Sequence, residues 1–184
     1  MATTVRKKLT YADYLKIPED GNRHEIIDGE WFKTPAPGLG HQRVVNKLNT
    51  LVYAFVEAGN LGRVYVAPTE VVLSPMDVVQ PDVIFISTER ASKEKTANID
   101  GAPDLVIEVM SPSTAERDRR EKSEAYERRG VAEYWLVDID ARLFEIREFG
   151  AIRRTRVYKA GQSFGSGLLP GLKVVVDEIF AVLL

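Results

Sequence analysis

Two short apolar segments, each carrying one carboxylate, constrain the fold of this chain more than any other feature. Glu108 lies inside the segment DLVIEVMSP (residues 104–112), and Asp82 lies within VVQPDVIFIS (residues 78–87), directly before a run of branched apolar residues. Such runs are typical of buried β-strands. A buried carboxylate is costly unless it is paired, hydrogen-bonded or bound to a metal. The fold must therefore place a compensating group beside each acid.

Alternation along the strands predicts which side chains share a face with each acid. Glu108 is expected on one face with Val106 and Met110, opposite a face of three further apolar residues, while Asp82 shares a face with two isoleucines. If the two strands are neighbours, their carboxylates repel each other unless a cation lies between them. Mg²⁺ prefers such oxygen ligands, and Mn²⁺ accepts the same set.

Composition excludes several classes of protein and site. The 184 residues suit a single domain spanning 1–184, and the absence of any long apolar run or secretory leader favours a cytoplasmic protein. With no cysteine and only two histidines, neither a disulfide framework nor a typical zinc site is expected. A net charge of −2 provides no overall attraction to nucleic acid.

Periodicity and turn residues predict a mixed α/β (α+β) domain with a central sheet. The local signals are an N-cap at Thr10, a tight Asp28–Gly29 hairpin turn, a helix C-cap at Gly59, a Ser113–Glu116 capping box and a C-cap at Gly130. The expected elements are a helix at 9–18, a hairpin at 24–34, a helix at 41–57, β-runs at 63–74, 78–87 and 103–110, a charged helix at 111–130, paired strands at 133–149 and an apolar end at 174–184.

The charged helix offers a cationic partner for the buried acids. Asp118, Lys122 and Tyr126 are spaced four residues apart and share a face, and the helix follows closely after the strand of Glu108. Lys122 is therefore expected near the carboxylates, although a solvated helix is the alternative interpretation. Glu25, in the hairpin, is a third candidate acid, for which a solvated edge-strand position is the alternative.

Several segments of the chain together resemble a known family. The segments LTYADYLKIPEDGNRHEIIDGEW, GHQRVVNKL, VVQPDVIFIS, APDLVIEVMSPST, RDRREKSEAYERRGVAEYWLVD and SGLLPGL are similar to those of the Uma-type restriction endonucleases, also called domain of unknown function 820, within the PD-(D/E)xK nuclease superfamily. The resemblance implies a restriction-endonuclease-like core with a mixed central sheet flanked by helices, an N-terminal helix and a β-hairpin. It also implies metal-dependent hydrolysis of DNA phosphodiester bonds.

The resemblance implies roles for individual residues. Asp82 matches the metal-binding aspartate and Glu108 the acid of the second half-motif, whereas Met110 stands where the superfamily places its lysine. Lys122 matches a lysine that has moved to the following helix, and Glu25 matches an additional N-terminal acid.

The chemistry that the resemblance implies assigns the remaining roles. Mg²⁺ or Mn²⁺ would be held by Asp82, Glu108 and the carbonyl of Val109, with Lys122 orienting the attacking water or offsetting charge in the transition state. Supporting roles are expected for three further residues. Asp118 and Tyr126 would position Lys122, and Gln42 would contact phosphate or water.

Three functional hypotheses remain open from the sequence. A metal-dependent DNA endonuclease accounts for the acids and Lys122 together, whereas a non-catalytic nuclease-fold module for dimerisation or nucleic-acid binding accounts for Met110 and the acidic composition. A hydrolase of small phosphoesters accounts for the acids alone. A homodimer is expected because residues 174–184 are apolar and duplex-cutting nucleases pair their active sites across a two-fold axis. The basic stretch at 144–159 is interpreted as a solvated strand face.

Overall fold

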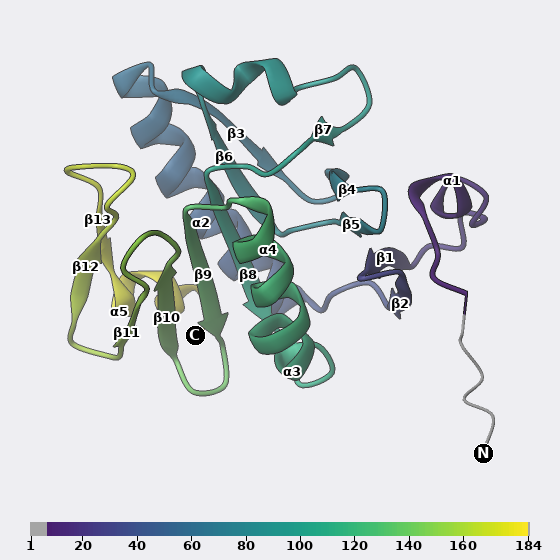
Figure 1. Ribbon diagram of the computed structural model, residues 1–184. Helices are drawn as coiled ribbons and strands as arrows, with labels where there is room; N and C mark the ends of the chain where they lie inside the picture. Colours follow the sequence, from purple (N-terminus) through teal and green to yellow (C-terminus); the bar gives the residue numbers. More distant parts are fainter. Residues whose placement is uncertain (1–6, 184) are drawn as a thin grey trace.

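A six-stranded mixed sheet forms the centre of the computed structural model, which describes residues 7–183 (Figure 1). Its strand order is β11-β10-β9-β8-β6-β3. Only β8 and β9 run parallel, and every other neighbouring pair in this sheet is antiparallel. The strands are β3 (Gly62–Val66), β6 (Val83–Ser87), β8 (Leu105–Met110), β9 (Glu133–Asp138), β10 (Leu143–Glu148) and β11 (Arg154–Tyr158).

A second sheet of five strands contains the N-terminal hairpin. Its order is β2-β1-β5-β4-β7, and a separate two-stranded sheet pairs β12 with β13. The bounds are β1 (Arg23–Ile27), β2 (Glu30–Thr34), β4 (Val71–Ser74), β5 (Asp77–Val79), β7 (Ile99–Asp100), β12 (Ser163–Gly165) and β13 (Lys173–Val175). The short helix α1 (Tyr11–Tyr14) precedes the hairpin.

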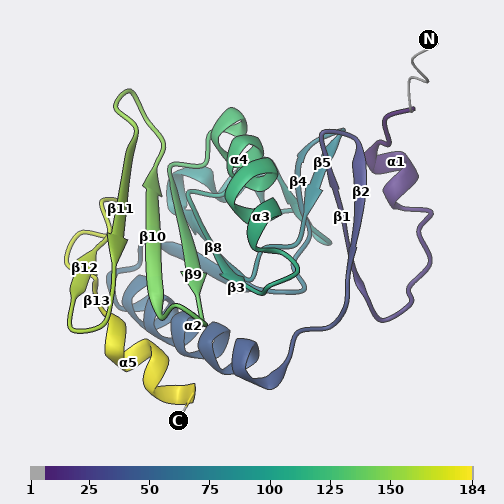
Figure 2. The ribbon, with the colours of Figure 1, turned by 90° about the horizontal axis from the view of Figure 1, so that it is seen from below.

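Helices cover both faces of the central sheet (Figure 2). The long helix α2 (Leu39–Gly59) and the C-terminal α5 (Val176–Phe180) lie on one face, and the charged helix lies on the other. The charged helix consists of α3 (Ala115–Arg117), a π-helical turn (Asp118–Lys122) and α4 (Ser123–Arg129), and 3₁₀ turns span Thr88–Lys93 and Ala181–Leu183. This arrangement confirms the predicted mixed sheet flanked by helices.

Strand β8 is buried on both faces, as its sequence predicts. Leu105, Ile107 and Val109 join the core beneath α2, whereas Val106 and Met110 join the core beneath α4. Glu108 therefore points toward the charged helix. Because β6 is the antiparallel neighbour of β8, the segments that carry Asp82 and Glu108 lie side by side.

The segment 78–87 is not the single strand that its composition predicts. It divides into β5 and β6, which belong to different sheets, and Asp82 lies in the connection just before β6. Pro81 has no N–H for a strand ladder, so the division falls where pairing is weakest. Residues 63–74 divide in the same way into β3 and β4.

The turn signals are confirmed at most of the predicted positions. Asp28 and Gly29 have φ angles of 49° and 76°, as a two-residue hairpin turn with positive φ at both positions requires, and Gly130 caps α4 at φ 87°. At Thr10, the Asp13 carboxylate accepts hydrogen bonds from the backbone N–H and the hydroxyl, at 3.0 and 2.9 Å.

Two predicted helix ends are wrong. The left-handed cap of α2 is Asn60 at φ 48°, one residue beyond Gly59, because asparagine also tolerates this conformation. The Ser113–Glu116 capping box does not form, because the chain enters α3 one residue later, at Thr114.

The apolar C-terminal segment belongs to the core of the domain itself. Val176, Ile179 and Phe180 are buried in the cluster beneath α2, and Leu183 packs against it. Most of the segment is therefore packed inside this chain, while Val175, Val182 and Leu183 are partly exposed, and the dimer stays a prediction. Leu184 lies outside the described residues. None of the helices within residues 7–183 combines the length and apolar character needed to cross a bilayer.

Candidate active site

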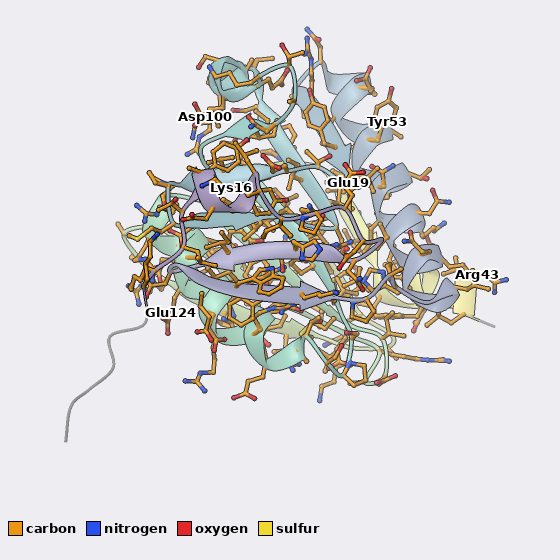
Figure 3. All side chains as sticks on the ribbon, turned by 90° about the vertical axis from the view of Figure 1, so that its right-hand side faces the viewer. Lys16, Glu19, Arg43, Tyr53, Asp100 and Glu124 are labelled. Atoms are coloured by element: carbon orange, nitrogen blue, oxygen red, sulfur yellow. The ribbon has the colours of Figure 1, made fainter. Side chains whose placement is uncertain are left out.

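A cavity of about 170 Å³ lies where the hairpin, the start of α2, the end of β8 and the charged helix meet. Most of the predicted site residues line it together: Glu25, Asp82, Glu108, Val109, Asp118 and Lys122. Gln42 is exposed on α2 and does not line the cavity, whereas its neighbour His41 does. Figure 3 shows the hairpin crossing the molecule between α2, marked by Arg43 and Tyr53, and α4, marked by Glu124.

Lys122 is the buried centre of this site. Its Nζ lies 2.8 Å from Glu108 Oε1, 2.8 Å from Glu25 Oε1 and 3.7 Å from Asp118 Oδ1, and its side chain is 2% exposed. Burial acts to lower the pKa of Lys122, but the three carboxylates outweigh it and hold the pKa above its ordinary value. The amine thus stays charged and compensates the buried acids.

One face of the charged helix points toward the interior of the protein. Asp118, Lys122 and Tyr126 are all buried, so the interpretation of this face as solvated is wrong. The Tyr126 hydroxyl donates to Glu108 Oε1 at 2.8 Å, and the Tyr134 hydroxyl donates to the Asp118 carbonyl at 3.0 Å. Between Asp118 and Lys122 the helix makes a π turn, a local widening that often occurs at functional sites.

Asp82 is held by a different set of groups. Its Oδ1 lies 3.0 Å from Arg23 Nη1, and its Oδ2 accepts the Val109 N–H at 2.8 Å and lies 3.2 Å from His41 Nε2. Burial acts to raise the pKa of Asp82, but the bond to His41 and the charge of Arg23 hold it below its ordinary value. Asp82 is therefore a carboxylate.

The two central acids have opposite pKa shifts. Burial raises the pKa of Glu108, and the neighbouring Asp82, Asp118 and Glu25 add to this, while Lys122 opposes it only in part. Carboxyl groups whose environments separate their pKa values are typical of sites where one acid stays ionised and the other exchanges a proton.

Glu25 is also part of the site rather than a solvated edge residue. Its side chain is 1% exposed, its Oε1 accepts the Gln80 N–H at 3.0 Å, and its Oε2 lies 3.6 Å from Arg117 Nη2. Two buried carboxylate oxygens of the site, Glu25 Oε2 and Asp118 Oδ1, accept no hydrogen bond from any of residues 7–183. Buried oxygens that accept no hydrogen bond have the capacity to accept a further cation.

The donor set fits a hard divalent cation that takes few protein ligands. Within residues 7–183, no three His, Asp or Glu side chains converge closely enough to hold a metal unaided. Mg²⁺ commonly uses only one or two carboxylates and keeps several waters. Asp82 and Glu108, with the backbone of Val109 between them, match this requirement.

Sequence reasoning missed three cationic residues of the cavity: Arg23, His41 and Arg117. Arg23 lies two residues before Glu25 in RHEIID, and the charge at Arg23 could have been noted as a partner for a buried acid. In the basic stretch 144–159, the side chains of Arg153, Arg154, Arg156 and Lys159 are exposed as interpreted. Arg147 is different, because it is half-buried against the charged helix and donates to Ser123 Oγ and to the Arg119 carbonyl.

Comparison with known proteins agrees with this architecture. Residues 11–177 match the model of the Uma2 family, described as putative restriction endonucleases. The chain belongs to the Uma2 family. Its fold matches the crystal structure of a putative nuclease belonging to DUF820 from Anabaena variabilis ATCC 29413 with a TM-score of 0.82 and 20% identity, covering 96% of this chain and 99% of the other. No curated protein matches this Uma2 member.

Proposed function

We propose that this Uma2 protein is a metal-dependent endonuclease that hydrolyses DNA phosphodiester bonds with Mg²⁺ or Mn²⁺. The observation that carries the proposal is the convergence of Lys122 with Glu108 and Glu25 at 2.8 Å, in the cavity that also contains Asp82. The amine expected beside the half-motif acid is thus supplied from the following helix. Membership of a restriction-endonuclease family supports DNA as the substrate.

Asp82, Glu108 and the Val109 carbonyl are the proposed metal ligands, with Glu25 completing the surrounding shell. A bound divalent cation supplies a Lewis acid for a phosphate oxygen and lowers the pKa of a coordinated water. The Val109 N–H fixes the Asp82 carboxylate, and the Tyr126 hydroxyl fixes Glu108. The carboxylates are therefore oriented before the cation arrives, which reduces the cost of binding it.

Lys122 is the proposed electrostatic catalyst. Its charge, preorganised between two acids, orients the attacking water and offsets negative charge that develops on the phosphoryl group. Asp118 and Tyr126 position Lys122. Asp118 pairs with its Nζ, and the Tyr126 hydroxyl donates to Glu108, which also pairs with Lys122.

A cleavage assay tests the proposal. The protein is expected to nick supercoiled plasmid or cut single-stranded DNA with Mg²⁺ or Mn²⁺, and not in the presence of a chelator. Agarose electrophoresis measures the first activity and denaturing electrophoresis the second. Hydrolysis of bis(p-nitrophenyl) phosphate without any DNA cleavage would favour a small-phosphoester hydrolase instead.

A non-catalytic binding module is the second candidate. It is favoured by the pairing of Asp82 with Arg23 and His41 and of Glu108 with Lys122, so that both proposed ligands already have cations. DNA binding without cleavage of any substrate, together with calorimetry that detects no divalent cation binding, would support this module over the nuclease.

We also propose that two copies associate when the protein acts on duplex DNA. One cavity of about 170 Å³ can engage only one phosphodiester at a time, so cutting both strands in one event requires two sites. Light scattering at micromolar concentration is expected to report a dimer, at least with DNA present. A monomer under both conditions would instead predict nicking of one strand per encounter.

A further inference from the structure

The cavity contains equal numbers of acidic and basic side chains, and they form two groups. An inner group surrounds Lys122 and an outer group surrounds Asp82. The acids are Glu25, Asp82, Glu108 and Asp118, and the bases are Arg23, His41, Arg117 and Lys122. A divalent cation would add two positive charges to a cavity whose own charges are already compensated.

The inner and outer cations differ in accessibility. Lys122 is 2% exposed and contacts three carboxylates, so it is committed to the interior. The side chains of Arg23 and His41 are 18% and 13% exposed, and their ion pairs in the cavity are with Asp82. Arg23 and His41 can therefore leave their partner at a smaller desolvation cost than Lys122 can.

Arg23 and His41 bind the carboxylate that the proposed function assigns to the metal. Arg23 Nη1 lies against Oδ1 of Asp82, and His41 Nε2 lies against Oδ2, so each oxygen already has a basic side chain as its neighbour. A metal ion at Asp82 would repel both side chains at close range. They must then bind another anion or remain unpaired at the cavity mouth.

We propose that Arg23 and His41 form a phosphate-binding subsite, held on Asp82 until a metal ion binds there and then transferred to the phosphate group of the substrate. This inference rests on the proposed nuclease function and assigns the side chains that recognise the phosphodiester. A guanidinium fork matches two phosphate oxygens, and a second donor beside it fixes their orientation. The start of α2 adjoins the subsite, and among the residues that the structure describes no side chain caps its N-terminus at Gly38.

Metal affinity is the first measurement. Arg23→Met removes a cation that competes for Asp82, so Mn²⁺ binding measured by calorimetry is expected to tighten about tenfold, the size of effect that one adjacent opposite charge has on a carboxylate. His41→Asn should act in the same direction. Arg63→Met is the matched control, because Arg63 pairs with Glu94 outside the cavity.

DNA affinity is the second measurement and should change in the opposite direction. Binding of a short fluorescein-labelled duplex in Ca²⁺ is measured by fluorescence anisotropy at several salt concentrations. The salt dependence of the affinity then reports the number of phosphate contacts. Arg23→Met is expected to weaken binding and to reduce the slope of log K against log[salt] by about one. Arg23→Lys should retain most of the slope, because it keeps the charge but not the fork. Thermal unfolding of each variant checks that it is folded.

The combined outcomes separate this inference from the function on which it rests. Tighter metal binding with weaker DNA binding supports the subsite. If wild type binds metal and DNA but Arg23→Met leaves both unchanged, or weakens metal binding, the side chain only orients Asp82 and the subsite is wrong. If wild type binds no divalent cation, the nuclease proposal fails, and the subsite fails with it.

Discussion

Lys122→Met is expected to lower the free energy of unfolding by about 3–5 kcal/mol, because it removes the buried cation that pairs with the carboxyl groups of Glu25 and Glu108. The same change should reduce turnover by about 10²–10³, the usual cost of removing one preorganised charge at a developing anion. Urea denaturation measures the first effect. Plasmid cleavage, at a temperature where the variant is folded, measures the second.

Two further variants separate the structural role of Lys122 from its chemical role. Adding Glu25→Gln removes one of the carboxyl groups that have lost their cation, so the double variant should regain stability but not turnover. Lys173→Met, on the exposed side of β13, is the control and should change neither. If Lys122→Met cleaves DNA as fast as Lys173→Met, the lysine supplied from the helix has no catalytic role.

The stability lost in Lys122→Met should also depend on pH. Glu108 already has a pKa raised by burial, and loss of the Lys122 charge raises it further. The folded variant then binds a proton that the unfolded chain releases, so its stability rises as pH falls from the raised pKa toward the ordinary value for glutamate. Because wild-type Glu108 gains the same proton below its own raised pKa of about 8, the difference from wild type should shrink with decreasing pH only between the variant's higher pKa and about 8, as measured by urea denaturation at several pH values.

Asp82→Asn is expected to weaken Mn²⁺ binding by more than about 100-fold, because loss of an outer-shell partner alone costs about 10–100-fold and Asp82 is a proposed direct ligand. Asparagine keeps one oxygen that can accept the Val109 N–H, so local geometry should be largely retained. DNA cleavage should fall to background. Calorimetry and the plasmid assay measure the two effects.

The control for Asp82→Asn is Asp100→Asn, an isosteric change on the exposed edge strand β7. It should leave metal affinity and cleavage at the wild-type level. Unchanged Mn²⁺ affinity in Asp82→Asn would show that Asp82 is not a ligand. Its role would then be limited to pairing with Arg23 and His41.

Some features of this protein are determined by short stretches of sequence. The burial of β8 on both faces follows from the alternation of apolar residues around Glu108, and the cost of burying that carboxylate indicates a site. The hairpin turn at Asp28 and the cap at Gly130 follow from the few residue types that adopt positive φ angles. The shared face of Asp118, Lys122 and Tyr126 on the charged helix follows from their spacing.

Other features were decided only by tertiary structure. Segment 78–87 divides between two sheets because each half finds a different neighbour, which local composition cannot specify. Lys122 is buried because carboxylates from β1 and β8 converge on it, although its own helix has the composition of a solvated one. Arg23 and His41 reach Asp82 from a hairpin and a helix distant in the chain. Sequence alone thus indicates that the buried acids need cations, but only packing determines which cations approach them, because those contacts join elements with no local relation.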